Sequence, residues 1–531
     1  MSLLLSIFPI VLLIFLMVKK NGLPSYIALP LIALLVYVLQ LTYFKNGFAM
    51  VNANVISGMI ATLTPITIIF GAILFNRMME VSGGTNILRK WLSNISDNSV
   101  AQLMIIGWAF AFMIEGASGF GTPAAIAAPI LVGLGFKPLR VAVFTLMTNT
   151  VPVSFGAVGT PTWFGFEPLN LSEAMTLEIG QISALVHCVA ALVIPLLALL
   201  SVVEWATIRR NLIFIYLSIL SCTVPYFLIA QLNYEFPALV GGAIGMLISI
   251  GLAKLGVGLA KDKRAEEKQA VSAGEIFIAM FPTVMLIAIL IITRIPQLGV
   301  KSLLTDSTEW LSASMGGLGM LEISQSLIIA LKNILGTGVA SSYKTLYVPS
   351  LIPFVVTVVL CLLLFRLSGS QSRDIFASSW QQVKKPFLAL LGALIMVKLM
   401  LTGGESSMVI TIGKGFADFT GTNWTYFSSY LGAIGSFFSG SNTVSNLTFG
   451  GIQLSIAETA GLSVPLILAL QSVGGAMGNM VCLNNIIAVC GVLNVTKQEG
   501  PVLRKTVTPM LIYGIIAGLV AFVLMRTGYV S

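Results

Sequence analysis

The chain has 531 residues, of which 57% are hydrophobic and only 9% are charged. An ordinary soluble domain carries about 25% charged residues, so this composition excludes a soluble fold and requires lipid to cover most of the surface. The formal net charge is +9, yet the basic residues stand in short clusters between apolar runs, for example Lys19-Lys20, Arg209-Arg210 and Lys384-Lys385. This arrangement is typical of the positive-inside rule, and it indicates a lipid bilayer rather than a nucleic acid as the partner.

The residue types that carry enzyme chemistry are too sparse for an active site. The chain has one histidine, His187, and it contains no HExxH motif, no GxSxG motif and no paired catalytic aspartates. Its five cysteines lie in apolar runs without CxxC spacing, which predicts small buried side chains rather than disulfides or metal ligands (Cys188, Cys222, Cys361, Cys482 and Cys490). We therefore expect no catalytic activity, no bound metal and no cofactor.

Ten apolar runs are long enough to cross a bilayer, which takes about 17–25 helical residues: 2–18, 23–44, 52–79, 183–205, 211–232, 236–257, 274–296, 348–366, 383–402 and 506–526. The first run lacks a basic segment before it and a cleavage site after it, so we interpret it as a retained transmembrane helix. Two further regions, 101–165 and 424–492, are apolar but interrupted by Gly, Pro, Ser, Thr and Asn. The expected fold is an all-α polytopic membrane protein with roughly 12–16 membrane segments, including paired re-entrant hairpins and broken helices.

Two connections between these runs are more polar. Residues 261–269 form a charged loop. Residues 300–347 are mixed in character, and we expect an external loop with an amphipathic helix around 321–335. The sequence leaves open whether 300–347 also contains a membrane-embedded segment.

An internal repeat relates the two halves of the chain. Pro65 recurs as Pro386, 321 positions later, and several neighbouring residues recur at the same offset. The segments 118–122 and 439–443 also coincide, and after a small drift 156–160 matches 475–479. We predict a first repeat over 1–205, a linking helix pair and charged cytoplasmic loop over 206–273, and a second repeat over 274–531.

The number of crossings predicts how the repeats are oriented. Each copy contains an odd number of crossings, and two spans, 211–232 and 236–257, join the copies. Corresponding helices are therefore an odd number of crossings apart, so the repeats should be inverted. The basic clusters then fall on one face and the acidic residues Glu167, Glu173 and Glu178 fall on the other, which places both termini outside.

Inverted repeats with broken helices at matching positions are typical of alternating-access transporters, because non-helical backbone in hydrocarbon must find partners in protein, water or substrate. In the first break, 115–123, three glycines permit positive φ, and Thr122 can cap a helix whose free N–H groups would suit an anion. The second break, 439–443, offers the same chemistry from the opposite side. Alternatively, Gly and Ser at these breaks only allow tight helix packing.

The candidate substrate-binding residues lie at these breaks and in the two crossing helices: Gly116, Ser118, Gly119, Gly121, Thr122, Asn149, Gly156, Gly159, Thr160, Ser439, Gly440, Ser441, Asn442, Thr443, Gly478 and Asn479. Glu115 is the first candidate for proton coupling, because an ionised group inside the bilayer costs about 2.5–3.5 kcal/mol and protonation avoids that cost. His187 is the second candidate. The alternatives are that Glu115 only caps its hairpin and that His187 is a packing residue with satisfied hydrogen bonds.

At these residues the chain resembles the bacterial lactate permease family. Residues 115–126, EGASGFGTPAAI, are similar to that family's EGAxGFGxPxAI signature, and 131–138, 149–159 and 439–446 continue the likeness. The resemblance implies proton-linked uptake of L-lactate, and of D-lactate or glycolate, across a bacterial cytoplasmic (inner) membrane. It also implies kinship with transporters built from inverted repeats with paired hairpins. The oligomeric state is left open, with a homodimer among the options.

Two residues depart from the family pattern. The family usually has SGSDT where this chain has Asn442, and it usually has a lysine where this chain has Asn479. An acid and a base are missing together, which would keep the site neutral. The neutral oxygens of Asn442, Asn479 and Thr160 also suit sodium, so the alternative is a sodium-coupled or exchange carrier of another small organic anion.

Overall fold

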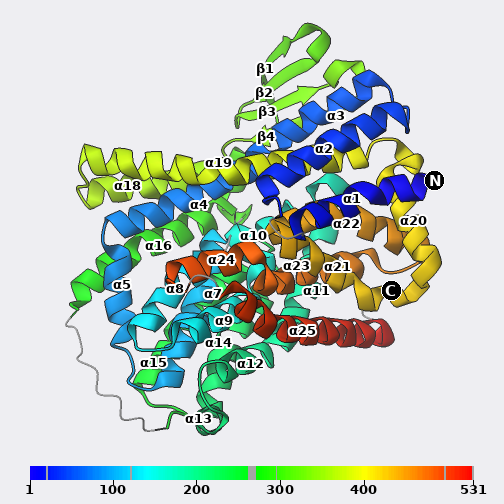
Figure 1. Cartoon of the computed structure of the whole chain (residues 1–531). Helices are drawn as coiled ribbons and strands as arrows, with labels where there is room; N and C mark the ends of the chain where they lie inside the picture. Colours follow the sequence, from blue (N-terminus) through cyan, green and yellow to red (C-terminus); the bar gives the residue numbers. More distant parts are fainter. Residues whose placement is uncertain (19–21, 120–121, 261–270, 295, 496–497, 529–531) are drawn as a thin grey trace. The chain divides into compact units, whose positions relative to one another are not determined.

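The structure is a computed structural model, and it describes every residue except 19–21, 120–121, 261–270, 295, 496–497 and 529–531 (Figure 1). The fold divides into two compact units, each of which draws on both halves of the chain. Unit 1 comprises Met1–Thr85 and Phe277–Gly415, and unit 2 comprises Asn86–Ile276 and Phe416–Ser531. The predicted repeat boundaries 1–205, 206–273 and 274–531 and the inverted relation of the repeats stay predictions.

The helices of unit 1 pack around one long helix, α19, which runs from Gly369 to Met400 and contacts α2, α3 and α4. A capping box fixes its start, because Ser368 and Gln371 exchange side-chain-to-backbone hydrogen bonds. Glycine allows close packing, since a Cβ on Gly392 would collide with the backbone of α2 at Pro30. The other helices of this unit are α1 (Ser2–Val18), α2 (Ser25–Thr42), α3 (Phe48–Ala61), α4 (Leu63–Val81), most of α16 (Ala273–Arg294), η4 (Pro296–Leu298), α17 (Val300–Leu304), η5 (Gly316–Leu318), η6 (Ile334–Gly336), η7 (Ser350–Val356), α18 (Thr357–Leu364) and η8 (Gly404–Ser406).

The connection between 300 and 347 folds as a small antiparallel sheet, so the expected helix around 321–335 is wrong. The sheet has the order β1-β2-β3-β4, formed by Glu309–Ser314, Met320–Ser324, Ile328–Lys332 and Ser341–Lys344. β2 and β3 pair antiparallel through a turn in which Leu327 takes a φ of 54°, and the isoleucines at 323, 328 and 329 favour strands. An open sheet has unpaired edges that hydrocarbon cannot satisfy, so we expect this segment to lie outside the bilayer.

Unit 2 contains both interrupted regions. The first supplies α6 (Ser99–Met104), the π-helical turn η1 (Ile105–Phe110), α7 (Ala111–Ser118), α8 (Thr122–Gly133), α9 (Pro138–Thr148), η2 (Val153–Phe155), α10 (Gly156–Trp163) and η3 (Glu167–Leu169). The second supplies α21 (Trp424–Ser439), α22 (Asn442–Ala460), α23 (Val464–Gly478), η10 (Asn479–Val481) and α24 (Leu483–Val492). The remaining helices of this unit are α11 (Glu173–Ala191), α12 (Ile194–Leu200), α13 (Trp205–Arg210), α14 (Leu212–Ala230), α15 (Pro237–Lys254), η9 (Gly421–Asn423) and α25 (Glu499–Thr527). Three helices, α16, α5 (Gly84–Ser93) and α20 (Met408–Thr420), cross the unit boundaries.

The prediction of a polytopic helical membrane protein is confirmed. Within the described part of the chain, nine helices are long and apolar enough to cross a membrane, and a bent pair that starts at Pro138 makes a tenth if it is counted as one span. The most apolar window of Ser99–Ser118 is 100% buried, whereas that of Ala273–Arg294 is 33% buried. The helix that carries Glu115 is therefore an interior element, and α16 has the exposed apolar surface expected of a lipid-facing helix.

Candidate functional site

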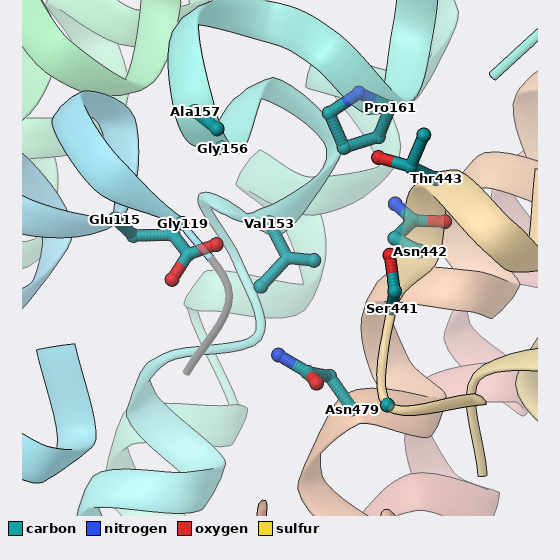
Figure 2. Close-up of a pocket in the computed structure, with 11 residues that line it drawn as sticks. Glu115, Gly119, Val153, Gly156, Ala157, Pro161, Ser441, Asn442, Thr443 and Asn479 are labelled. Atoms are coloured by element: carbon teal, nitrogen blue, oxygen red, sulfur yellow. The ribbon is translucent and has the colours of Figure 1, made fainter. Parts of the chain in front are cut away.

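A pocket lies inside unit 2, where the two interrupted regions meet (Figure 2). Its cavity volume is about 20 Å³, which is room for about one water molecule. The lining residues come from α7, η2, α10, the junction of α21 with α22, and η10: Glu115, Gly119, Val153, Gly156, Ala157, Pro161, Gly440, Ser441, Asn442, Thr443 and Asn479. All but Val153, Ala157 and Pro161 are among the residues that the sequence singled out.

Glu115 enters the pocket from α7 and is 2% exposed. Its Oε2 accepts a hydrogen bond of 3.0 Å from Nδ2 of Asn149, the C-cap residue that follows α9. Its Oε1 lies against Gly156, where a Cβ would collide with it. The first hairpin helix stops three residues after Glu115, since Ser118 is its last residue and Gly119 turns away with a φ of 59°. Glu115 therefore lies at the tip of a helix inside the protein, beside a break in a second helix.

The second helix of the first region is broken by left-handed backbone. α9 and the segment that begins at Val153 meet at an angle of 64°, and Ala157, Val158 and Gly159 have φ values of 45°, 57° and 68°. Each non-glycine residue in this conformation costs roughly 1–2 kcal/mol, most for a β-branched residue such as Val158. Side chains bind the freed carbonyls, because Trp163 Nε1 donates to Val158 O at 3.1 Å and Thr160 Oγ1 donates to Ala157 O at 2.5 Å. Strain that the surroundings hold in place is typical of functional sites.

The second hairpin contributes the start of α22. α21 ends at Ser439, Gly440 turns the chain with a φ of 77°, and Ser441 caps α22 by accepting from the Val444 backbone N–H at 3.3 Å. The first two residues of the helix, Asn442 and Thr443, line the pocket, and no acceptor for their backbone N–H groups is found among the described residues. These donors, with the positive end of the helix dipole behind them, favour an anion.

Asn479 supplies a third donor from the junction at which α23 ends and η10 begins. The Nδ2 group of Asn485 donates to Asn479 Oδ1, which leaves the Nδ2 group of Asn479 as the free end of the amide. Figure 2 shows this nitrogen pointing into the space between Glu115 and Ser441. The second half of the chain therefore lines the pocket with hydrogen-bond donors, and the first half contributes a carboxyl group.

Behind the pocket, a buried hydrogen-bond network joins five helical segments, α11, α25, η2, α23 and α22. His187 of α11 is fully buried, and its ring nitrogens contact Tyr513 Oη at 2.5 Å and Ser154 Oγ at 2.8 Å. Ser154 Oγ also lies 3.0 Å from Ser472 Oγ and 3.5 Å from Asn442 Nδ2. His187 therefore does not line the pocket but reaches a lining residue through Ser154. The sequence analysis did not identify Ser154, Ser472 or Tyr513.

Several predicted residues lie next to the pocket without lining it. Gly116, Gly159 and Gly478 serve close packing, because a Cβ on each would collide with backbone at Leu239, Tyr234 and Ala433 respectively. The hydroxyls of Ser118 and Ser439 bond to carbonyls of their own helices, and Thr160 and Asn149 have the roles given above. Gly121 lies outside the described residues, and Thr122 is the first residue of α8. The alternative interpretation of these glycines as packing residues thus fits three of them.

The electrostatic character of the pocket is simple. Glu115 is the one ionisable side chain among the lining residues, and none of them is Lys, Arg or His. Within the part of the chain that the structure describes, no three His, Cys, Asp or Glu side chains gather where they could hold a metal ion. The arrangement is suited to binding a small molecule through neutral donors beside a carboxyl group that can exchange a proton.

Comparison with known proteins shows which family the chain belongs to. Residues 2–527 match the L-lactate permease family. The chain is 64% identical over 529 residues to the "Putative L-lactate permease" of Haemophilus influenzae, with 100% of this chain and 99% of that protein covered. It is 26% identical over 548 residues to the glycolate permease of Escherichia coli, with 98% and 95% covered. Among solved structures, MtrF of Neisseria gonorrhoeae aligns over 97% of each chain, with a TM-score of 0.48 and 13% identity. The match over nearly its whole length shows that this chain belongs to the L-lactate permease family.

Proposed function

We propose that this chain carries L-lactate and glycolate across a bacterial cytoplasmic membrane together with a proton, by alternating access to the pocket in unit 2. Family membership and the glycolate permease relative support a small 2-hydroxy monocarboxylate as the substrate. The observation that carries the proton coupling is the isolation of Glu115, which lines the pocket without any cationic side chain beside it.

The carboxylate of the substrate would bind at the second-half side of the pocket. The backbone N–H groups of Asn442 and Thr443 and the amide nitrogen of Asn479 offer hydrogen-bond donors there. The start of α22 adds the favourable field of its dipole, worth about 0.3–1 kcal/mol at an exposed site and up to ~2 kcal/mol when partly buried. Three neutral donors replace the charged partner that a carboxylate would otherwise need.

The carboxyl group of Glu115 then couples the substrate to a proton. An ionised Glu115 would repel a bound carboxylate, and two like charges about 4 Å apart at an effective dielectric constant of 20 repel by about 4 kcal/mol. Binding of the anion therefore favours the protonated carboxyl, and release of the anion favours loss of that proton. The empty carrier can return in a different protonation state from the loaded one, which links the two fluxes.

Uptake into proteoliposomes tests this proposal. The purified protein should accumulate labelled L-lactate when an inside-alkaline pH gradient is imposed, and unlabelled glycolate should compete. An imposed sodium gradient without a pH gradient should drive no accumulation. If neither acid is transported under either gradient, the substrate assignment is wrong. If a sodium gradient alone drives uptake, the assignment of the proton as the coupled ion is wrong.

One observation favours sodium as a second candidate for the coupling ion. Oδ1 of Asn442 and Oγ of Ser436 are buried, and neither has a hydrogen-bond partner among the described residues. Both atoms lie close to Gly475, where a Cβ would overlap Asn442 Oδ1 and lie 3.4 Å from Ser436 Oγ. Neutral oxygens next to a broken helix suit a monovalent cation. The sodium arm of the uptake experiment decides between the two ions.

A further inference from the structure

We propose that His187 is a positioning residue and not a carrier of the coupled proton. It stays neutral with its proton on Nε2, and through Ser154 it holds the amide of Asn442 at the pocket. Only the predicted effect on affinity for the transported acid rests on the proposed function. Its structural content can be tested without any substrate.

The hydroxyl of Tyr513 fixes the protonation of His187. Tyr513 is fully buried in α25, and its hydroxyl has one hydrogen to donate. The acceptor found for that hydrogen among the described residues is Nδ1 of His187, at 2.5 Å. A nitrogen that accepts carries no proton, so the ring is neutral and its proton is on Nε2. An imidazolium ring would present N–H at both nitrogens and leave the Tyr513 hydrogen buried without an acceptor, which is costly.

Ser154 passes this orientation on to Asn442. Nε2–H of His187 donates to Ser154 Oγ at 2.8 Å, and the amide nitrogen of Asn442 approaches the same oxygen at 3.5 Å. The Ser472 hydroxyl also donates to Ser154 Oγ, at 3.0 Å, so the hydrogen of Ser154 itself goes to the carbonyl oxygen of Ser472 at 3.2 Å. If Ser154 instead gave its hydrogen to His187, the bond to the Ser472 carbonyl would be lost.

The network therefore sets the position of the second hairpin relative to the first broken helix. Ser154 follows Val153, which lines the pocket, and Asn442 is both a lining residue and the first residue of α22. Among the described residues, no hydrogen bond joins this network to Glu115, whose side chain accepts from Asn149 instead. Loss of the network should weaken substrate binding and leave proton coupling intact.

The first test uses the single histidine of the chain. Protein labelled with ¹⁵N-histidine in lipid gives one imidazole signal pair in solid-state NMR, so no assignment is needed. We expect the neutral Nε2–H form throughout the pH range in which the carrier works, and an admixture of the Nδ1–H form in Tyr513→Phe. A charged ring, or an Nδ1–H ring in the parent protein, would overturn the inference. Because no substrate is present, this result is independent of whether the chain carries lactate.

The second test compares two amides at position 187. The amide nitrogen of Gln can occupy the place of Nε2 and donate to Ser154, whereas that of Asn can reach only the place of Nδ1. We expect His187→Gln to keep the KM for L-lactate within about twofold, and His187→Asn and Ser154→Ala to raise it about fivefold to tenfold, as for the loss of one buried hydrogen bond. The maximal rate and the pH-driven accumulation ratio should remain. Equal KM values in the Gln and Asn variants would show that His187 only fills space.

The third test asks whether Tyr513 and Ser154 act through one chain of contacts, and whether His187 carries the coupled proton instead. Tyr513→Phe combined with Ser154→Ala should raise KM no further than Ser154→Ala alone, because both changes act through the same oxygen. Additive increases in KM would show that Tyr513 and Ser154 do not act through the same contacts. Loss of pH-driven accumulation in His187→Gln, with counterflow retained, would make His187 the proton carrier.

Discussion

Asn149 donates a 3.0 Å hydrogen bond to Oε2 of Glu115, and it does so with a neutral amide. An amide N–H can donate to a carboxylate and equally to the carbonyl oxygen of a protonated carboxyl group. The contact therefore survives when Glu115 gains or loses its proton, whereas a lysine or arginine in the same place would hold the ionised form. This neutral partner makes Glu115 suited to reversible proton exchange inside the protein.

Replacement of Glu115 by Gln tests that role most directly. Gln imitates the protonated side chain permanently, so substrate exchange, which needs no net proton release, should continue at a substantial rate. Accumulation driven by a pH gradient should disappear, because the empty carrier can no longer return without its proton. Counterflow and driven uptake measured side by side in proteoliposomes check this. Retained proton-driven accumulation in Glu115→Gln would remove Glu115 from the mechanism, and a modest parallel fall in both activities would indicate a hairpin cap.

Gly156→Ala should displace the same carboxyl group without altering its chemistry. Gly156 has a φ of −63°, which alanine adopts freely, but the added Cβ would collide with Oε1 of Glu115. We expect pH-driven lactate uptake to fall by roughly tenfold or more, since small misplacements of a reacting group have effects of that size. Gly133→Ala is the matched control, because nothing lies within 4 Å of its Cβ position. Equal uptake by the two variants would show that the position of Oε1 is unimportant.

Gly440→Ala, compared with Gly461→Ala, should distinguish the effect of the hairpin turn on substrate binding from the loss of stability that alanine causes at any left-handed position. Gly440 has a φ of 77° and Gly461, at the other end of α22, has a φ of 65°, so alanine at either costs roughly 1–2 kcal/mol. A Cβ on Gly440 would lie 3.3 Å from Cys482 Sγ beside the pocket, whereas Gly461 has open space around it. We expect both variants to lose a similar amount of thermal stability, while only Gly440→Ala raises the KM for L-lactate.

Melting temperatures and KM values measured on both variants check the comparison. A similar rise in KM in Gly461→Ala would mean that the effect follows from stability and not from the turn.

The sequence located the pocket because glycine, serine and proline interrupt apolar runs visibly. Glu115, Gly119, Gly440 and Asn479 stand at such interruptions, and they do line the pocket. The same signal cannot separate a lining glycine from a packing one. Gly116 and Gly478 lie at the breaks too, yet each allows a neighbouring backbone to approach. Helix packing and ligand access both favour the residue without a side chain, so only coordinates distinguish them.

One feature of this fold has no local signature in the sequence, and another has only a weak one. Tyr513 and His187 are 326 positions apart, and nothing in either sequence neighbourhood indicates that they meet. The strands β2 and β3 were predicted as one amphipathic helix, because two short apolar segments joined by a tight turn imitate a helical period over fifteen residues. The β-branched isoleucines at 323, 328 and 329 were the available evidence for strands.

The predicted inversion of the two halves implies that two loops lie on opposite sides of the membrane. Gly135 lies between α8 and α9, Gly461 lies between α22 and α23, and both are exposed. In the predicted repeats each loop follows the second helix of a hairpin, so inversion should place Gly135 inside the cell, near Lys137 and Arg140, and Gly461 outside. Single cysteines at these positions, in a chain whose five native cysteines are replaced, can be labelled with a membrane-impermeant thiol reagent. Gly461→Cys should react in intact cells and Gly135→Cys only after permeabilisation. Labelling of both in intact cells, or of neither, would mean that the hairpins enter from the same side and that the count of crossings between the halves is wrong.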